Sequence, residues 1–203
     1  MRRETPVIVN DHASEGRSNL PRIYLDMDGV LADFDAGLRA LGIEPDQATN
    51  KSRSLMTPDE VVMKDKVYDA ILAQPFFNTL PLMHDAQSLW DFCAPFEPVI
   101  LTAAPSRESG FEKAAREKRE WIEEHFGPIP DERFICTHSS KKQNYVGHLP
   151  GRVQVLVDDR PSNVDQWRGA GGHGILHLSA EASIGLLEMF CVRVVASVDG
   201  AAS

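Results

Sequence analysis

Short apolar segments, each followed by polar residues, recur at wide intervals along this chain and restrict its fold more than any other feature. Four of them cover residues 23–25, 98–101, 133–136 and 153–157, and a fifth, residues 174–178, follows a glycine-rich turn. The fourth segment is almost continuously apolar, as expected of a strand that is covered on both faces. We therefore predict buried strands that carry polar residues at their carboxyl ends.

Helical patterns fill two of the intervals between these strands. Residues 85–92 and 108–126 carry apolar residues at helical spacing, and the longer pattern stops at Gly127-Pro128, a conventional helix end. Strands that alternate with helices predict an α/β fold, in which a parallel sheet is covered by helices on both faces. In such a fold the ligand binds at the carboxyl ends of the strands.

The chain of 203 residues suits a single domain with a small insertion. We interpret residues 1–20 as a polar N-terminal tail, although residues 6–9 could form a short edge strand. The α/β core is expected to comprise residues 21–36 and 79–203. Residues 37–78 do not follow the alternation, because they contain glycine, prolines and several short helical stretches. We predict that they form a small helical cap over the site.

Charge and composition narrow the range of partners. The formal net charge is −9, which disfavours long nucleic acid, because neutralisation of phosphates by Lys and Arg dominates that affinity. A small anionic ligand held by a local cation remains compatible with this charge. Cys93, Cys136 and Cys191 are an odd number of cysteines without paired spacing, which favours reduced thiols and a cytoplasmic location. The sequence has no apolar run long enough for a signal-peptide core or a membrane span.

Two acidic pairs lie at predicted strand ends. Asp26 and Asp28 follow the first strand, with Gly29 allowing a tight turn after them, and Asp158-Asp159 end the fourth. Like charges held together raise each other's pKa, and a divalent cation relieves this repulsion. Oxygen ligands alone select magnesium or calcium over zinc. Either pair by itself could equally be an acidic turn that caps a helix, but two pairs at strand ends favour a metal site.

Two further elements could bind phosphate. Thr102 and Ala103 end the second strand, where a hydroxyl and backbone N–H groups can cradle a phosphate, although a simple turn would have the same sequence. Lys141 and Lys142 follow the third strand. One of these lysines could neutralise a phosphate and a nearby carboxylate, while ordinary surface lysines are the alternative.

The order of DMDGVLADF, ILTAAP, KK and LVDDRPSN resembles the four motifs of the haloacid dehalogenase-like phosphatases. More narrowly, it is similar to the 5′(3′)-deoxyribonucleotidase family with its phage and bacterial relatives. The resemblance covers about residues 22–178 and is weakest in the cap. It implies a Rossmann-like core and a magnesium-dependent phosphomonoesterase that forms a phosphoaspartate.

The resemblance also implies roles for the four aspartates. Asp26 would be the nucleophile and a magnesium ligand. Asp28 would be the general acid and base, and its backbone carbonyl would bind the metal. Asp158 would bind magnesium, and Asp159 would support the metal through water.

The phosphate would be held by groups from the second and third motifs. Thr102 and the Ala103 N–H would bind the phosphoryl group, although Ala103 stands where a serine is common, so that one hydroxyl is missing. A lysine of the third motif would bridge the phosphate and the nucleophile. Lys142 is the preferred candidate over Lys141, because the sequence from Lys142 to Tyr145 resembles a K-x-x-Y pattern in phage relatives.

Three aromatic residues lie where the chain enters and leaves the cap. Phe34, Phe76 and Phe77 could sandwich a nucleobase, since bases stack on aromatic faces, or they could be a hinge packing cluster. We expect a small phosphorylated substrate, a nucleoside monophosphate in first place, with a homodimer as a possible assembly. The alternatives are a phosphatase for another small phosphate ester or a nucleic-acid 3′-phosphate end, and a catalytically silent binding module.

Overall fold

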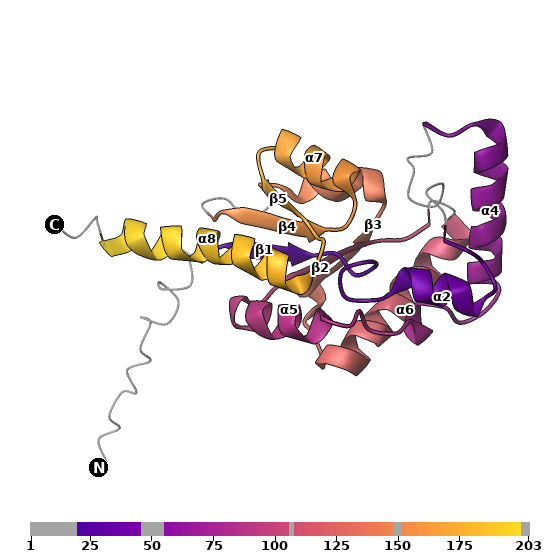
Figure 1. Ribbon diagram of the computed structural model, residues 1–203, viewed down its shortest axis with the longest axis horizontal. Helices are drawn as coiled ribbons and strands as arrows, with labels where there is room; N and C mark the ends of the chain where they lie inside the picture. Colours follow the sequence, from indigo (N-terminus) through magenta and orange to yellow (C-terminus); the bar gives the residue numbers. More distant parts are fainter. Residues whose placement is uncertain (1–19, 46–54, 106–107, 148–151, 200–203) are drawn as a thin grey trace, which may run out of the picture.

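The computed structural model describes the backbone of residues 20–45, 55–105, 108–147 and 152–199 (Figure 1). Side chains are described in the same ranges except at residues 108–109 and 191–199. The predicted polar tail therefore lies almost entirely outside the described residues, and so does its possible edge strand.

Within the described ranges, five strands form a central sheet with the strand order β3-β2-β1-β4-β5. Every neighbouring pair is parallel, which confirms the predicted α/β class. The order reverses at β1, and such a switch point is where open parallel sheets bind their ligands. The strands are β1 Arg22–Leu25, β2 Val99–Ala103, β3 Phe134–Thr137, β4 Gln154–Asp158 and β5 His173–Leu176.

Helices cover both faces of this sheet. On one face, Ile23 and Leu25 of β1 join the main core, which is covered by α5 (Ala86–Cys93), α6 (Glu108–Phe126) and α8 (Ala180–Asp199). On the other face, Tyr24 packs against Trp167 of α7 (Pro161–Gly169), at 5.0 Å between ring centroids. Figure 1 shows α7 and α5 on opposite sides of the sheet. The alternation along β1 thus explains the three layers.

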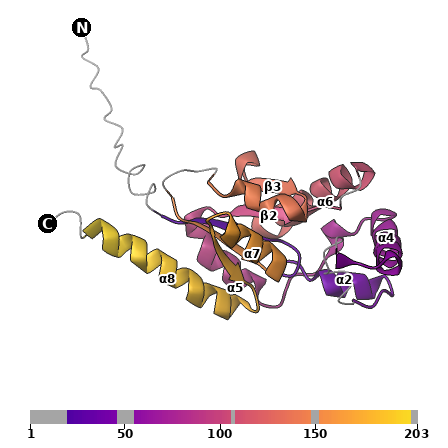
Figure 2. The ribbon, with the colours of Figure 1, turned by 90° about the horizontal axis from the view of Figure 1, so that it is seen from above.

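In the described part of the cap, residues 37–45 and 55–78, the chain forms α2, which begins before residue 37 (Phe34–Ala40), and α4 (Pro58–Leu72). Both lie beyond the carboxyl ends of the strands in two perpendicular views (Figures 1 and 2). Because α2 already begins at Phe34, the boundary expected after residue 36 falls inside this helix. The start of α4 is a capping box, in which Thr57 Oγ1 accepts from the Glu60 N–H and Glu60 Oε2 accepts from the Thr57 N–H.

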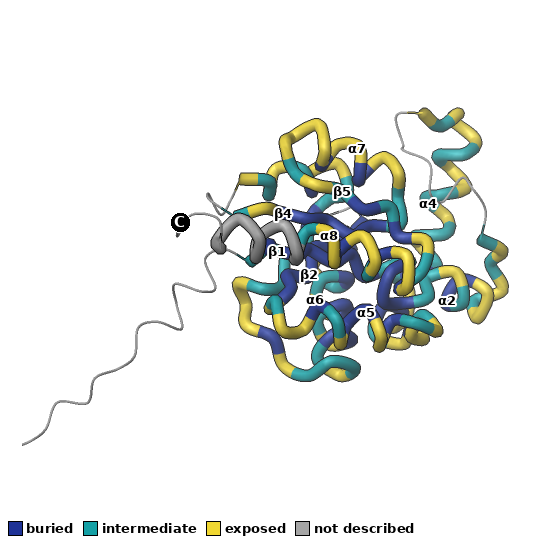
Figure 3. Tube along the Cα trace, turned by 60° about the vertical axis from the view of Figure 1, so that its left-hand side comes forward, coloured by how far each residue is buried: buried dark blue, intermediate teal, exposed yellow. Residues whose placement is uncertain are grey.

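The cap is held against α6 of the core. A Cβ atom on Gly110 of α6 would collide with the side chain of Leu72, and one on Gly37 of α2 would collide with Leu80. The backbone of α6 at Gly110 and that of α2 at Gly37 therefore lie close to these leucine side chains. Figure 3 shows that the three central strands, β1, β2 and β4, are mostly buried, whereas α4 carries mainly exposed and partly buried residues.

Within the described residues, none of the helices has both the length and the apolar character that a membrane span requires. Cys93 is buried and Cys136 is partly buried, and neither forms a disulfide with another described residue; the expectation of reduced cysteines stays a prediction. The side chain of Cys191 lies outside the described residues, and the cytoplasmic location stays a prediction.

Candidate active site

The two acidic pairs meet at the carboxyl edge of the sheet. Residues Leu25 and Val157 are partners in the register of β1 with β4, so the residues that follow them lie side by side. Asp26, Asp158 and Asp159 each offer a carboxylate oxygen within 4.8 Å of the others. Asp28 does not join this cluster, because its carboxylate is turned toward α6.

Lys142 lies between the two strand ends that carry the cluster. Its ammonium Nζ is 2.7 Å from Asp26 Oδ2 and donates to Asp158 Oδ2 at 2.6 Å, while its side chain is 1% exposed. Burial alone would raise the pKa of Asp26, but Lys142 and then Lys118 outweigh it and hold that pKa below its ordinary value. Asp26 is therefore an ionised carboxylate that has been removed from water.

The structure separates the two candidate lysines. Lys142 is buried beside Asp26, whereas Lys141 is exposed. Both belong to the 3₁₀ helix η5 (Ser139–Tyr145), in which successive side chains point roughly 120° apart. Only one of two adjacent residues can therefore face the site, and the inclusion of Lys141 among the catalytic candidates is not supported by this geometry.

Asp158 and Asp159 have different surroundings. Asp158 is fully buried and accepts hydrogen bonds from Asn163 Nδ2 and from the Arg160 N–H. For Asp159, burial and then the charges of Asp26 and Asp158 raise the pKa to about 8. Three carboxylates facing one lysine leave excess negative charge, and all three offer oxygen ligands. The residues present therefore fit a hard divalent cation such as magnesium.

Asp28 pairs with a lysine that sequence reasoning missed. Lys118 of α6 is fully buried, and its Nζ donates to Asp28 Oδ2 at 2.6 Å and to Thr102 Oγ1 at 2.9 Å. The other oxygen, Asp28 Oδ1, is buried without a hydrogen-bond partner within the described part of the chain. Burial raises the pKa of Asp28, Lys118 opposes the rise and Asp26 adds to it, and the result is a pKa above the ordinary value. A metal-binding role for the Asp28 carbonyl stays a prediction.

The second motif lies beside this pair. Thr102 is fully buried and Ala103, Ala104 and Pro105 line the pocket. The Ala104 N–H donates to Thr137 O, so it continues the pairing with β3. A phosphate-binding role for Thr102 and Ala103 stays a prediction, although the hydroxyl does lie next to Lys118.

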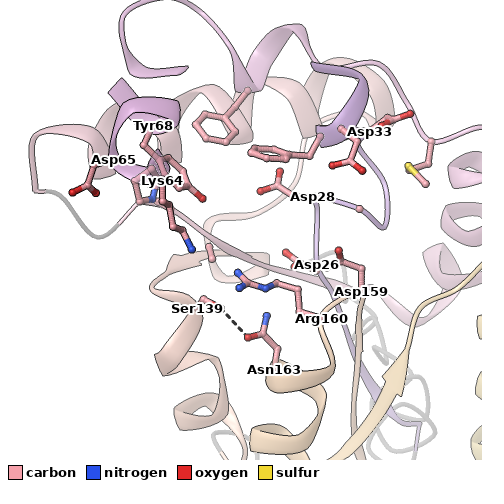
Figure 4. A pocket seen from close by; sticks show the side chains of 18 residues that line it. Asp26, Asp28, Asp33, Lys64, Asp65, Tyr68, Ser139, Asp159, Arg160 and Asn163 are labelled. Carbon is pink, nitrogen blue, oxygen red and sulfur yellow. Dashed lines mark hydrogen bonds between the residues drawn. The ribbon is translucent and has the colours of Figure 1, made fainter. Parts of the chain in front are cut away.

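A pocket of about 350 Å³ lies between these strand ends and the cap. Figure 4 shows Asp26, Asp28 and Asp159 on the core side and Lys64 and Tyr68 reaching toward it from α4. Burial, with the charge of Asp28 adding to it, raises the pKa of the Tyr68 hydroxyl. The sequence analysis did not single out this tyrosine, which lies one helical turn after Lys64 on the same side of α4.

The family model described as "5′ nucleotidase, deoxy (Pyrimidine), cytosolic type C protein" matches residues 21–183. This span is well over half of the chain and contains the sheet, the cap and all of the site residues described above. The chain belongs to this nucleotidase family.

Individual relatives of this nucleotidase-family protein agree with that assignment. The human cytosolic-type 5′(3′)-deoxyribonucleotidase is 31% identical over 153 residues, which cover 68% of this chain and 70% of the relative. A putative 5′(3′)-deoxyribonucleotidase of Vibrio phage KVP40 is 30% identical over 148 residues, covering 72% and 71%. Among solved structures, a haloacid dehalogenase-like hydrolase from Streptococcus pneumoniae aligns with 84% of this chain and 91% of its own, at 13% identity and a TM-score of 0.47. The family model and the two deoxyribonucleotidase relatives confirm, at the level of the family, the resemblance inferred from the motifs and the phosphomonoesterase class.

The three phenylalanines of this nucleotidase-family protein are divided between pocket and hinge. Phe34 and Phe77 line the pocket and lie stacked, at 6.4 Å between centroids and 29° between planes. Phe76 does not line it and packs edge-on against both other rings. The N–H groups of Phe76 and Phe77 both donate to Glu117 Oε2 at 3.2 Å. This anchored turn directs adjacent side chains to different surroundings, so the geometry does not support the predicted substrate contact for Phe76.

Lys118 escaped prediction because its partners come from other parts of the chain. One signal was available in the nucleotidase sequence, because Lys118 falls on the buried stripe of α6 with Ala114, Trp121 and Ile122, at spacings of three and four residues. A lysine on such a stripe needs a buried anionic or acceptor partner.

Proposed function

We propose that the chain is a magnesium-dependent phosphomonoesterase that forms a covalent phosphoaspartate on Asp26 and takes nucleoside 5′-monophosphates, deoxyribonucleotides included. The observation that carries this proposal is the pairing of two neighbouring carboxylates with opposite electrostatics. Lysines hold the pKa of Asp26 low, whereas burial raises that of Asp28. Two titratable groups whose pKa values are driven apart are the usual mark of a nucleophile or base beside an acid.

In the first step an Asp26 oxygen attacks phosphorus, a bond forms between them, and the bond from phosphorus to the substrate oxygen breaks. A carboxylate is a weak nucleophile toward a phosphate dianion because both are negative. Lys142, 2.7 Å from Asp26 Oδ2, would lower this repulsion and stabilise charge on the transferred phosphoryl group.

Asp28 would move the protons. In its protonated form it donates to the departing substrate oxygen through Oδ1, the oxygen that has no hydrogen-bond partner among the described residues. Once ionised, it takes a proton from a water molecule that attacks the acyl phosphate and releases phosphate from Asp26. The raised pKa of Asp28 supports this alternation, because it favours the protonated form before the first step.

Asp26, Asp158 and Asp159 would hold magnesium. When bound, this ion neutralises charge on the reacting phosphate oxygens. The hydrogen bonds of Asn163 Nδ2 and the Arg160 N–H to Asp158 orient that carboxylate toward the cluster, as outer partners of metal ligands usually do.

The substrate proposal has two supports. The relatives carry the name 5′(3′)-deoxyribonucleotidase. Phe34 and Phe77 line the pocket, and the partly exposed Phe34 ring offers a face on which a base could stack. The polar residues of the cap side, Lys64 and Asp65, leave a sugar phosphate as the second candidate.

A substrate screen with phosphoenzyme trapping tests the whole proposal. We expect release of phosphate from deoxynucleoside 5′-monophosphates with magnesium, at higher kcat/KM than from sugar phosphates or 3′-phosphorylated oligonucleotides. Acid quenching should leave one phosphoryl group on the peptide that contains Asp26, and the Asp26→Asn variant should form none and lose more than about a thousandfold in kcat. If a fully folded Asp26→Asn protein keeps more than about a hundredth of the wild-type kcat, the covalent mechanism is excluded, because loss of a nucleophile costs far more than that. Absence of turnover on every phosphate ester would favour a silent binding module.

A further inference from the structure

Lys118 lies behind the reacting groups and not in the pocket. It is fully buried, it is absent from the pocket lining, and its ammonium contacts one side chain from each of two strand ends. A buried ammonium group is costly unless it is paired and hydrogen-bonded. Both partners of Lys118, Asp28 and Thr102, belong to the proposed reaction centre.

The contact with Asp28 determines which of its oxygens faces the substrate. Lys118 Nζ holds Oδ2 at 2.6 Å, and Oδ1 is the oxygen without a partner in the described part of the chain. A free carboxylate can rotate about its terminal torsion, which has a broad energy well. Anchoring Oδ2 therefore fixes the direction of Oδ1, the atom that must exchange a proton with the leaving oxygen.

The contact with Thr102 has a similar consequence for the hydroxyl. A threonine hydroxyl has one hydrogen to donate and two lone pairs that accept. Because Thr102 Oγ1 accepts from Lys118 at 2.9 Å, and an ammonium group can only donate, the hydroxyl hydrogen has to point elsewhere. It is thereby left to donate to a phosphoryl oxygen.

We propose that Lys118 is a positioning residue that locks the Asp28 carboxylate and the Thr102 hydroxyl into one arrangement for proton transfer to the leaving group. This inference rests on the proposed phosphomonoesterase function. It assigns different tasks to the two buried lysines, because Lys142 contacts Asp26 and Asp158 whereas Lys118 contacts Asp28 and Thr102. Lys118 also lies 4.7 Å from the centre of the Phe77 ring, which connects this arrangement to the wall of the pocket.

The test compares two substrates of nearly the same shape, phenyl phosphate and p-nitrophenyl phosphate. The nitro group stabilises the departing phenolate, so p-nitrophenyl phosphate needs little help from a general acid, whereas phenyl phosphate needs more. The parameter is kcat/KM, which reports events up to formation of the phosphoenzyme. Neither substrate carries a nucleobase, so the comparison does not depend on base stacking.

Lys118→Met keeps the length of the side chain and removes the ammonium group. We expect kcat/KM for phenyl phosphate to fall by roughly a hundredfold, the lower range for loss of general acid catalysis, and that for p-nitrophenyl phosphate to fall about tenfold or less. Lys118→Gln, which keeps a neutral N–H donor, should lie between Lys118→Met and the wild type. Equal losses on both substrates in these variants, or no loss, would overturn the proposal.

Lys113→Met is the matched control. Lys113 lies on the same helix and pairs with Glu117 at 2.7 Å, but it does not contact Asp28. This variant should affect both substrates equally and slightly.

In an Asp28→Asn background, Lys118→Met should add no further discrimination between the substrates, because coupled residues are not additive. The double variant has no buried unpaired carboxylate at position 28, so it can be measured even if Lys118→Met alone fails to fold. If the double variant discriminates between the two substrates more than Asp28→Asn alone does, the proposal is overturned. A wild-type protein without activity on either substrate would remove the proposed function, and the assignment with it.

Discussion

Gly29 and Asp159 lie so close together that a Cβ atom at position 29 would be 2.5 Å from Asp159 Oδ2. Gly29 has a φ of +73°, a conformation in which glycine carries no steric penalty. The turn after the first motif therefore needs glycine for two reasons, its backbone conformation and its contact with a carboxylate of the second acidic pair.

Gly29→Ala should displace the Asp159 carboxylate and weaken metal binding. We expect the magnesium concentration for half-maximal activity to rise by roughly 10- to 100-fold, the effect typical of disturbing the surroundings of a metal site. Gly42→Ala is the control, because Gly42 has a φ of +72° and a Cβ atom there would meet no other described atom within 4 Å. Both variants should lose stability by about 1–2 kcal/mol from backbone strain, but only Gly29→Ala should change the magnesium dependence. An identical magnesium titration for the two variants would show that the contact is unimportant.

The two lysines of the third motif should respond very differently to substitution. Lys142→Met removes the only ammonium group that contacts both Asp26 and Asp158 in the described structure. We expect kcat to fall by about a hundredfold or more from lost charge stabilisation, and the acid limb of the kcat/KM profile to move to higher pH. The sign follows from Asp26, whose pKa is lowered by Lys142 and must rise without it.

Lys141→Met is the control, since the Lys141 side chain is exposed, and its activity and pH profile should match those of the wild type. If Lys141→Met were the more damaging change, the arrangement of η5 described here would be wrong.

Sequence patterns were sufficient for the sheet and the acidic cluster, but not for the pairing of charges around it. The strand-end rule brought Asp26 and Asp158 together, because parallel strands align their carboxyl ends. The contact of Lys118 with Asp28 depends on how α6 packs over β2, which no local pattern encodes. In the same way, the turn that carries Phe76 and Phe77 is held by hydrogen bonds to Glu117, a residue 40 positions or more away in the chain.

Asp159 should make metal-free stability depend on pH. Its pKa is raised from 3.8 to about 8 in the folded protein, so between these values the folded state holds one proton more than the unfolded chain. Stability therefore falls as the pH rises through this window, with a slope of at most about 1.4 kcal/mol per pH unit from this group. Magnesium binds the ionised carboxylate, so it should raise Tm more at pH 8 than at pH 5. The measurement is thermal unfolding in EDTA and in magnesium.

Asp159→Asn is the comparison for this experiment. In EDTA, the Tm of the variant should depend less on pH than the Tm of the wild type, because the contribution of Asp159 is removed. The variant should also be stabilised much less by magnesium. A wild-type protein whose response to magnesium is the same at both pH values would contradict the proposed metal site.

Phe34→Ala tests whether the pocket wall selects the substrate. Phe34 and Phe77 line the pocket, and a base stacked on an aromatic ring gains roughly 1–3 kcal/mol. Removing the Phe34 ring should therefore lower kcat/KM for a deoxynucleoside monophosphate by about one to two factors of ten, and that for p-nitrophenyl phosphate much less.

Phe76→Ala is the matched control for that experiment, because Phe76 belongs to the same aromatic cluster but does not line the pocket. It should destabilise the protein by about 3–5 kcal/mol, as buried Phe→Ala changes do, while leaving the ratio of the two kcat/KM values unchanged. The two variants thus separate packing from recognition: a loss of selectivity belongs to Phe34 and a loss of stability to Phe76. If Phe34→Ala instead lowers Tm and leaves the ratio of the two substrates unchanged, then all three rings form a hinge, and discrimination must come from the polar side chains of α4.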